Sequence, residues 1–263
     1  MPVDGGVPVD VDRTVDVDRT VDLDQTRRDW TTLGAADPLW AVLVAPGKRG
    51  GRWGVDEFLA TGRAEVDETV RWLAGLGLPT RWRRALDFGC GVGRLSQALT
   101  AYADEVVGVD ISPSMLATAG EIDGGEGAVR FVLNEAADLG QFPDASFDLV
   151  YSSLVLQHLP RPAVDRYLAE FLRVLRHGGV AVVQVPTRAR RTPKGLIWRY
   201  APDPWVRWVQ RRLLGYPAPM RMTTVPAREL SRLVAAYGGV VVGQSADHRY
   251  ANWRLAWFAL RRA

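Results

Sequence analysis

The stretch ALDFGCGVGRLSQAL, residues 85–99, places three glycines at alternate positions between an apolar run and a run with helical spacing. A glycine-rich turn that follows a strand and opens a helix lies at the carboxyl edge of an open α/β sheet, where such sheets bind ligands. A P-loop would need Lys and Ser or Thr after a four-residue gap, and a dinucleotide fingerprint would need glycine where Arg94 stands. The stretch therefore predicts a small-molecule site that is neither of these phosphate cradles.

Two carboxylates accompany this turn. Asp87 ends the strand before it, and Asp110 ends the next predicted strand, 17 residues after Gly93. An acidic residue at a strand end repels a pyrophosphate but favours a cationic amino group or a sulfonium. The two oxygens of Asp110 match a ribose diol, although Asp110 alone could equally be a helix-capping or loop residue. Taken with the turn, the carboxylates predict a site for a positively charged nucleoside.

Strand-like and helix-like segments alternate from about residue 83 onward. Apolar strands that alternate with helices predict an α/β fold, in which a parallel sheet is covered on both faces. The chain of 263 residues suits one large domain of this class. Strands are expected at 84–88, 105–110, 129–134, 147–153, 180–185, 240–248 and 255–262, and helices at 95–103, from Pro113 with Ser112 as cap, from 161 to before Gly178, and at 227–237.

The chain divides into three predicted parts. VDVDRT, VDVDRT and VDLDQT repeat over residues 9–26, and residues 1–26 carry seven Asp against two Arg. Three copies are too few to stack into a solenoid, so we expect residues 1–29 to be a disordered acidic tail. Residues 30–80 are predicted to be an N-terminal helical cover. Residues 81–263 are predicted to be the core, with 187–225 as an insertion that covers the acceptor pocket.

The composition excludes several classes of protein. There is no apolar run of about 18 residues and no signal-peptide pattern. The single cysteine, Cys90, fits a reducing cytosol, so we expect a cytoplasmic protein. The net charge is +3, and the arginines are scattered among Asp and Glu, which favours a solvated surface over a nucleic-acid interface. The repeat lacks the Gly and closing Glu of a calcium loop, and no metal is expected.

Four stretches carry a resemblance to a known family: LDFGCGVGRLSQAL, EVVGVDISPSML, FVLNEAADLGQFPDASFDLVYSSLVLQHLP and RVLRHGGVAVVQV. In this order and spacing, over about residues 55–263, the chain resembles the class I S-adenosylmethionine-dependent methyltransferases. The resemblance implies a Rossmann-like, doubly wound sheet of seven strands, the last antiparallel, with helices on both faces. It also implies S-adenosyl-L-methionine as cofactor and methyl transfer to a small-molecule acceptor by in-line displacement in a covered pocket.

The same resemblance implies the residues around the cofactor. Asp87 and the glycines would surround the methionine part, Asp110 would hold the ribose, and Ile111 would border the adenine. The family often has Asp or Asn where Glu135 stands. The cofactor-binding residues implied are Asp87, Gly89, Cys90, Gly91, Val92, Gly93, Asp110, Ile111, Met115, Glu135, Ala136 and Ser153.

His158 lies just past the strand predicted at 147–153 and is the histidine placed at the active edge. Its ordinary pKa suits a general base, which makes it the candidate catalytic residue. A base is needed only if the acceptor is protonated at the working pH. A structural or substrate-orienting role for His158 is the alternative.

The segment 187–224 is long, interrupted by prolines, and rich in Trp, Tyr, Arg and Met. Insertions at this point commonly cover the acceptor pocket in the family that the chain resembles. Candidate acceptor-contacting residues are Gln157, Trp198, Tyr200, Met220 and Met222, with Trp205 and Trp208 as further parts of an apolar lid.

Three other functions are alternatives to methylation of a small soluble acceptor. A basic, aromatic helix on a membrane surface could reach a lipid-linked acceptor, but the prolines break any long amphipathic face. Methylation of a nucleic acid is also disfavoured, because the sequence contains no recognisable RNA-binding module. A protein with this fold could also bind the cofactor without transferring its methyl group, since binding and chemistry use different residues.

Overall fold

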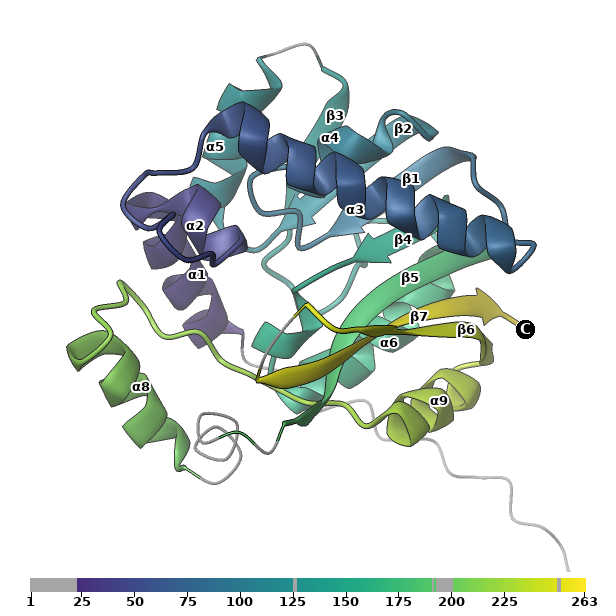
Figure 1. Cartoon of the computed structure of the whole chain (residues 1–263). Helices are drawn as coiled ribbons and strands as arrows, with labels where there is room; N and C mark the ends of the chain where they lie inside the picture. The colour runs from purple at the N-terminus through teal and green to yellow at the C-terminus, as the bar shows by residue number, and fades with distance from the viewer. Residues whose placement is uncertain (1–22, 125–126, 191, 193–200, 250–251) are drawn as a thin grey trace, which may run out of the picture.

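The computed structural model describes residues 23–124, 127–190, 192, 201–249 and 252–263 (Figure 1). In this part of the chain, seven strands form one sheet in the order β3-β2-β1-β4-β5-β7-β6. Neighbours from β3 to β5 pair in parallel, whereas β7 runs antiparallel to both β5 and β6. The predicted seven-stranded sheet with an antiparallel last strand is therefore confirmed. The strands are β1 (Trp82–Phe88), β2 (Ala103–Asp110), β3 (Val129–Leu133), β4 (Phe147–Ser152), β5 (Leu175–Ala189), β6 (Gly239–Asp247) and β7 (Trp253–Arg262).

Helices pack on both faces of the sheet, because successive strand residues point to opposite sides. Leu86 is buried with side chains of α6 and α9, whereas its neighbour Ala85 is buried with side chains of α3 and α4. The expected cap of α5 is confirmed, since the Ser112 hydroxyl accepts a hydrogen bond from the Met115 amide at 3.3 Å. The helices are α1 (Asp24–Ala36), α2 (Pro38–Val42), α3 (Val55–Gly75), α4 (Arg94–Leu99), α5 (Pro113–Asp123), the 3-10 turn η1 (Leu156–His158), α6 (Arg161–Val174), α8 (Asp203–Arg212) and α9 (Ala227–Ala236).

The boundary between α6 and β5 differs from the expectation. The helix ends at Val174 and the strand starts at Leu175, five residues earlier than predicted. Leu175 pairs with Phe147 across the sheet and is fully buried there. An apolar residue at this position fits the buried face of a helix as well as a buried strand, so its periodicity could not separate the two.

The N-terminal region also differs. Residues 1–22 of the expected tail lie outside the described residues, but residues 24–29 belong to α1 and are not a tail. The physical reason is tertiary: Leu23 and Leu33, at the two ends of α1, are both buried in the body of the protein. The acidic repeat runs into this helix without any change in composition that would mark its start.

Besides the two apolar clusters on the faces of the sheet, a third buried cluster joins the N-terminal helices to distant parts of the chain. It brings together Leu33, Trp40, Phe58, Met115 and Met220. The first three lie on α1, α2 and α3, Met115 lies on α5, and Met220 precedes α9. One side of the molecule, at the carboxyl ends of β1 and β2, is therefore covered by segments from both ends of the sequence.

Gly62 sets how closely α3 packs on α4. A Cβ atom at Gly62 would overlap the carbonyl oxygen of Arg94. We predict that Gly62→Ala lowers the free energy of unfolding by about 1–3 kcal/mol, because overpacking against rigid backbone outweighs the gain in helix propensity. Gly75→Ala is the matched control, since a Cβ at the end of the same helix meets nothing within 4 Å. Urea denaturation measures both variants, and equal effects would contradict the prediction.

Candidate functional site

The glycine turn between β1 and α4 is held in a left-handed conformation. Its three glycines, Gly89, Gly91 and Gly93, have φ angles of 73°, 54° and 81°. The amides of Gly89 and Cys90 both donate to the Val109 carbonyl of β2, at 2.8 and 2.9 Å. These bonds fasten the start of the turn to the neighbouring strand, so the turn opens at the carboxyl edge of the sheet.

Space as well as φ requires glycine in this turn. A Cβ on Gly89 would overlap the side chain of Val155, and one on Gly91 would lie 2.7 Å from Cγ2 of Val42. A side chain on Gly91 or Gly89 would therefore collide with neighbouring elements and would also be strained at positive φ. The alternating glycines are a structural requirement of this close packing.

A cavity opens above this turn and encloses about 840 Å³, counting the open space at its mouth. The lining comes from the turn, from the ends of β2 and β4, and from the N-terminal helices. Among the lining residues are Gly89, Cys90, Gly91, Asp110, Ile111, Met115, Ser153, Leu154, Val155, His158, Leu23, Thr26, Trp30 and Val42.

Asp110 is the carboxylate that lines the cavity. Its Oδ2 accepts from the Gly91 amide and its Oδ1 from the Ser112 amide, both at 2.9 Å. Burial raises the pKa of this carboxyl above its ordinary value, and the two amide bonds oppose that shift. Each carboxylate oxygen can accept a second hydrogen bond, so Asp110 can brace the turn and still bind two hydroxyl groups of a ligand.

Asp87 has a different environment. It is buried and lies outside the cavity lining, where its Oδ2 accepts from the Ser96 hydroxyl at 2.6 Å. Burial raises the pKa of Asp87 to about 7, although the Ser96 bond lowers it. Its negative charge near neutral pH is therefore partial, and the hydroxyl of α4 holds it beneath the turn.

Two small side chains of the cavity wall, Ser153 and Cys90, differ in what they can do chemically. The Ser153 hydroxyl is buried and has no hydrogen-bond partner among the described residues. An unsatisfied buried hydroxyl at a cavity wall is suited to bind a polar ligand atom. Burial raises the pKa of the Cys90 thiol well above its ordinary value, which keeps this cysteine protonated and unsuited to be a nucleophile.

His158 lines the cavity as a neutral ring. Its Nδ1 lies 2.7 Å from the Arg221 carbonyl oxygen, which can only accept, so Nδ1 carries the proton. Nε2 then accepts from the Gln157 side-chain amide at 3.0 Å. Burial lowers the pKa of His158 to about 4, against the smaller opposing effect of the Arg221 bond. The ring of Trp30 in α1 contacts the His158 ring at an interplanar angle of 63°, with 4.9 Å between centroids.

The remaining predicted residues lie in several places. Glu135 is exposed and forms an ion pair with Arg27 at 2.8 Å, and the Ala136 carbonyl accepts from the Tyr167 hydroxyl at 2.6 Å. Neither Glu135 nor Ala136 lines the cavity, whereas their neighbour Asn134 does. Val92 is buried in the third cluster, Gly93 caps α4, and Ile111 and Met115 line the cavity.

The acceptor candidates are described only in part. Trp198 and Tyr200 lie outside the described residues. Met220 is buried in the third cluster, and Met222 is half-buried. Gln157 lies outside the cavity lining, and its backbone carbonyl accepts from the Thr223 amide at 2.6 Å. The Thr223 hydroxyl donates to the carbonyl of Leu159, which does line the cavity, at 2.6 Å, so the segment before α9 is attached to the cavity wall.

The N-terminal helices contribute lining residues that sequence reasoning did not assign. Leu23, Thr26 and Trp30 project from the start of α1, and Val42 ends α2. The spacing of Leu23, Thr26 and Trp30, with Leu33 beyond, is helical and was available in the sequence. The acidic repeat that overlaps it concealed this signal.

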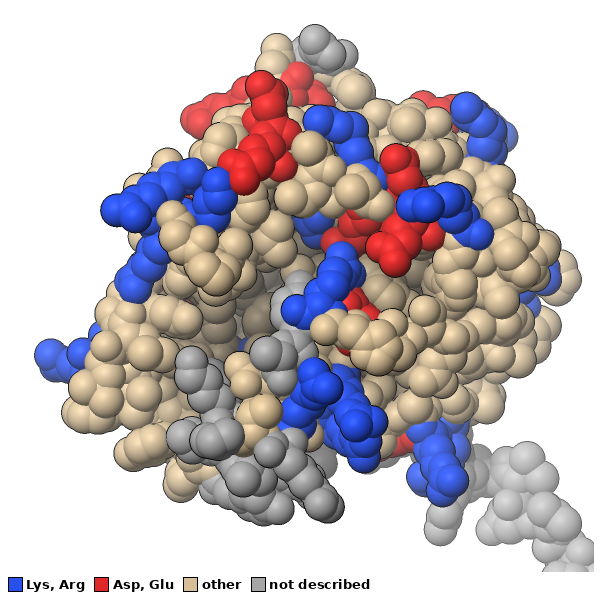
Figure 2. Space-filling model, viewed as in Figure 1, with Lys and Arg blue, Asp and Glu red and all other residues tan. Residues whose placement is uncertain are grey.

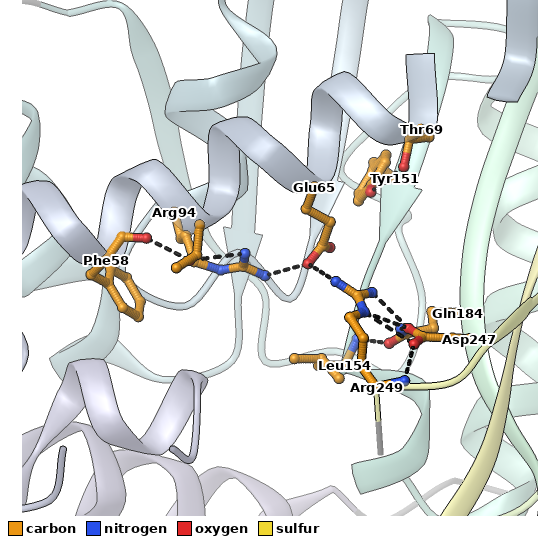
Figure 3. A network of polar contacts seen from close by, with 10 residues as sticks. Phe58, Glu65, Thr69, Arg94, Tyr151, Leu154, Gln184, Asp247 and Arg249 are labelled. Atoms are coloured by element: carbon orange, nitrogen blue, oxygen red, sulfur yellow. Dashed lines mark hydrogen bonds and ion pairs between the residues drawn. The ribbon is translucent and has the colours of Figure 1, made fainter. Parts of the chain in front are cut away.

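A chain of polar contacts connects the glycine-turn helix to the end of β6 (Figure 3). Arg94, the first residue of α4, donates to Glu65 of α3 at 3.1 Å, and both side chains are buried. The same oxygen of Glu65 lies 3.6 Å from Arg249, whose guanidinium pairs with Asp247 at 2.6 Å. Arg94 stands where a dinucleotide fingerprint would have glycine, and its guanidinium bonds to α3.

The contacts continue from Asp247 back to the cavity wall. The Gln184 side-chain amide donates to Asp247 at 2.7 Å, and its carbonyl oxygen accepts from the Leu154 amide at 3.2 Å (Figure 3). Leu154 lines the cavity with a φ of 62°, a conformation that is strained for a residue with a side chain. Gln184 therefore satisfies the backbone at the point where the chain leaves β4 in a strained turn.

Residues 86–183 match a family described as "Methyltransferase domain". The 2-methyl-6-phytyl-1,4-hydroquinone methyltransferase of Synechocystis sp. is 32% identical over 155 residues, which are 59% of this chain and 48% of that protein. The trans-aconitate 2-methyltransferase of Azoarcus sp. is 37% identical over 123 residues, 46% of this chain and 45% of that one. The chain thus spans about half the length of these curated relatives.

Solved structures share the fold. The magnesium protoporphyrin IX methyltransferase of Synechocystis, determined with bound SAH, aligns with a TM-score of 0.59 and 20% sequence identity. The alignment covers 91% of this chain and all of that one. At this identity the likeness concerns the fold, including the antiparallel last strand.

Among the described residues, no group of three or more His, Cys, Asp or Glu side chains could hold a metal ion.

The His158 environment leads to a pH prediction. Its pKa of about 4 lies below the ordinary value of 6.5, so the folded state resists protonation. The resulting contribution to stability is complete above pH 6.5 and is lost as the pH falls toward 4. We expect the His158 ring signals in NMR to show a neutral, Nδ1-protonated ring at pH 6, and to titrate normally once the protein is unfolded in urea. A midpoint near 6.5 in the folded protein would contradict the assignment.

The role of Gln184 can be tested by substitution. Gln184→Leu leaves the Leu154 amide without its partner and removes one of the hydrogen bonds to Asp247, whose Oδ2 keeps its bonds to Arg249. We predict that it lowers the free energy of unfolding by about 1–3 kcal/mol, the usual cost of an unsatisfied buried polar group. Gln244→Leu is the matched control, because Gln244 is exposed on β6. Chemical denaturation of both variants measures the difference, which should be absent if Gln184 only fills space.

Proposed function

We propose that the chain is a class I S-adenosylmethionine-dependent methyltransferase that transfers the methyl group of S-adenosylmethionine to a small-molecule acceptor; its residues 86–183 match a family described as a methyltransferase domain. The observation that supports this most directly is the pairing of the glycine turn with Asp110 at the mouth of one cavity. The turn allows close approach of a ligand to the backbone, and the carboxylate offers acceptors to a ribose diol.

The residues present fit the cofactor. Asp110 would accept from the ribose hydroxyls, and Ile111 beside it would contact the adenine. The methionine part would lie along the glycine turn, where Ser153 offers an unsatisfied hydroxyl. Bound S-adenosylmethionine supplies a methyl group that is already activated on a sulfonium sulfur. For Asp87, Glu135 and Ala136, which lie outside the cavity lining, the proposed role is indirect, through the position of the turn and of the loop after β3.

Catalysis by this chain would come from positioning and from exclusion of water. Alignment of the acceptor with the reacting carbon at near-contact distance supplies most of the acceleration expected for such a displacement. Trp30 of α1 lines the cavity beside His158, where its ring would help to exclude water from the reacting groups. His158 already uses both ring nitrogens and has a pKa of about 4. We therefore assign it an orienting role in the wall of the acceptor site and no role as general base.

The proposed acceptor is a small molecule that binds under residues 187–225. The described part of this segment reaches the cavity through the contacts of Arg221 with His158 and of Thr223 with Leu159. The two relatives are named for a phytyl hydroquinone and for trans-aconitate, which are both small but chemically different. The buried, protonated Cys90 thiol fits a reducing compartment, and we propose the cytoplasm as the site of action.

Binding and transfer can be tested with one pair of variants. We expect calorimetry to show that the chain binds S-adenosylmethionine, and that Asp110→Asn weakens this affinity about 10- to 100-fold through loss of charged hydrogen bonds. Asp104→Asn is the matched control, because Asp104 is exposed on the same strand. Denaturation shows whether each variant is folded. An Asp110→Asn protein that binds the cofactor normally would contradict the assignment.

Methyl transfer is tested separately from binding. Incubation with isotope-labelled S-adenosylmethionine and a small-molecule extract should give a labelled product that is heavier by one methylene in mass spectrometry. Asp104→Asn should keep this product and Asp110→Asn should reduce it. Binding of the cofactor with no labelled product from any extract would instead support a protein that binds without methyl transfer.

A further inference from the structure

The outer face of α8 exposes an unusual set of large apolar side chains. Trp205 and Trp208 are 47% and 53% exposed, and Leu213 and Leu214 just after the helix are 68% and 49% exposed. Large aromatic side chains are normally removed from water because each carries a large apolar surface. These two tryptophans and two leucines lie within ten residues of one another, and we call this exposed apolar set the α8 patch.

The α8 patch is held in place by the opposite face of the helix. Val206 and Gln210 are buried, and the Gln210 side chain exchanges two hydrogen bonds with the backbone of Met220, at 2.8 and 3.1 Å. Arg207 pairs with Asp29 of α1 at 3.1 Å. Arg49 donates to the Leu214 carbonyl at 2.8 Å. The exposed tryptophans thus belong to a fixed helix docked on α1 and on the cavity cover.

The charge around the α8 patch is positive. Arg211 and Arg212 lie in the last turn of the helix, and both are exposed. At the lower left of the molecule, where α8 lies in Figure 1, the visible surface in Figure 2 shows tan and blue side chains and no red ones. Elsewhere on this face acidic and basic side chains are mixed (Figure 2). An anionic surface would therefore complement the patch.

The docked face of α8 lies close to the proposed active site. A small side cavity is lined by Arg207 of α8 together with Asp29, Arg221 and Pro219. It shares Thr26, Trp30 and His158 with the main cavity. A surface that bound α8 would thus contact the same helix as carries Arg207, which lines this side cavity next to the main one.

We propose that the α8 patch docks the protein on a bilayer that contains anionic lipids, and that its acceptor is a small amphiphile dissolved in that bilayer. The statement about the acceptor rests on the function proposed above. Tryptophan favours the interface between water and lipid, and arginine pairs with anionic head groups. No helix in the described part of the chain is long and apolar enough to cross a membrane. The docking is therefore peripheral, through side chains that enter the interface.

This proposal reverses the preference drawn from the sequence. The prolines of 187–224 were expected to break any amphipathic face. In the structure Pro202 is the N-cap residue of α8, Pro204 lies in its first turn, and Pro217 follows its end. The prolines bracket the helix and leave its face intact.

The test uses the full chain and flotation with two kinds of vesicle. We expect binding to phosphatidylcholine vesicles that contain phosphatidylserine, weaker binding to phosphatidylcholine alone, and loss of binding at high salt. Tryptophan fluorescence should shift to the blue on binding, and brominated lipids should quench it. Trp205→Ser with Trp208→Ser should reduce affinity at least about tenfold, as should Arg211→Gln with Arg212→Gln.

The controls are exposed residues on other elements. Val240→Ser controls for loss of apolar surface, and Arg83→Gln with Arg228→Gln controls for loss of charge. All variants should bind S-adenosylmethionine with unchanged affinity, since none lies at the cavity. The proposal would be overturned if the control variants lost as much vesicle affinity as the variants of the α8 patch. So would an absence of vesicle binding, or light scattering showing that the α8 patch joins two copies of the chain.

These outcomes are independent of the proposed function. If the vesicle assay fails while the labelled product still forms, the docking surface is wrong and the methyl transfer stands. If vesicle binding follows the predicted pattern while no product forms, the docking stands and the methyl transfer fails. If lipid extracts yield no labelled product and a water-soluble fraction does, the amphiphilic acceptor is wrong.

Discussion

The left-handed turn of residues 89–93 is the constraint on which the site depends. Its glycines pass between Val155 on one side and Val42 on the other, with no room for a Cβ. Asp110 accepts a hydrogen bond from Gly91, so the residue that faces the cavity also braces the turn. The shape of the backbone and the charge of the site are therefore linked through a single carboxylate.

The two acidic residues at the turn, Asp110 and Asp87, differ in burial and therefore in what they can contact. Asp110 reaches the cavity, whereas Asp87 bonds to Ser96 beneath the turn with a raised pKa of about 7. Arg94 also borders the cavity, but its guanidinium is paired with Glu65 of α3. Together with the neutral ring of His158, these arrangements make Asp110 the dominant charge that a bound cation would meet.

The cover of the cavity is assembled from opposite ends of the sequence. Trp30 of α1 contacts His158, and the segment before α9 bonds to the same histidine through Arg221. The ion pair between Arg207 and Asp29 joins α8 to α1. Through these contacts α8 and the residues that cover the cavity are joined to the sheet edge at which the cavity lies. Lipid docking and acceptor entry would then occur on the same side of the molecule.

The sequence by itself predicted a parallel α/β sheet and the edge of that sheet at which the cavity lies. Alternating strand and helix periods and a glycine turn followed by an Asp-terminated strand are local patterns, because each depends on residues close in the chain. Tertiary structure alone decided that α1 covers the cavity, that Asp87 lies beneath the turn and that Gln184 supports Leu154. Those outcomes depend on burial and on contacts between residues far apart in sequence. A local pattern carries no information about which distant side chain will occupy the neighbouring space.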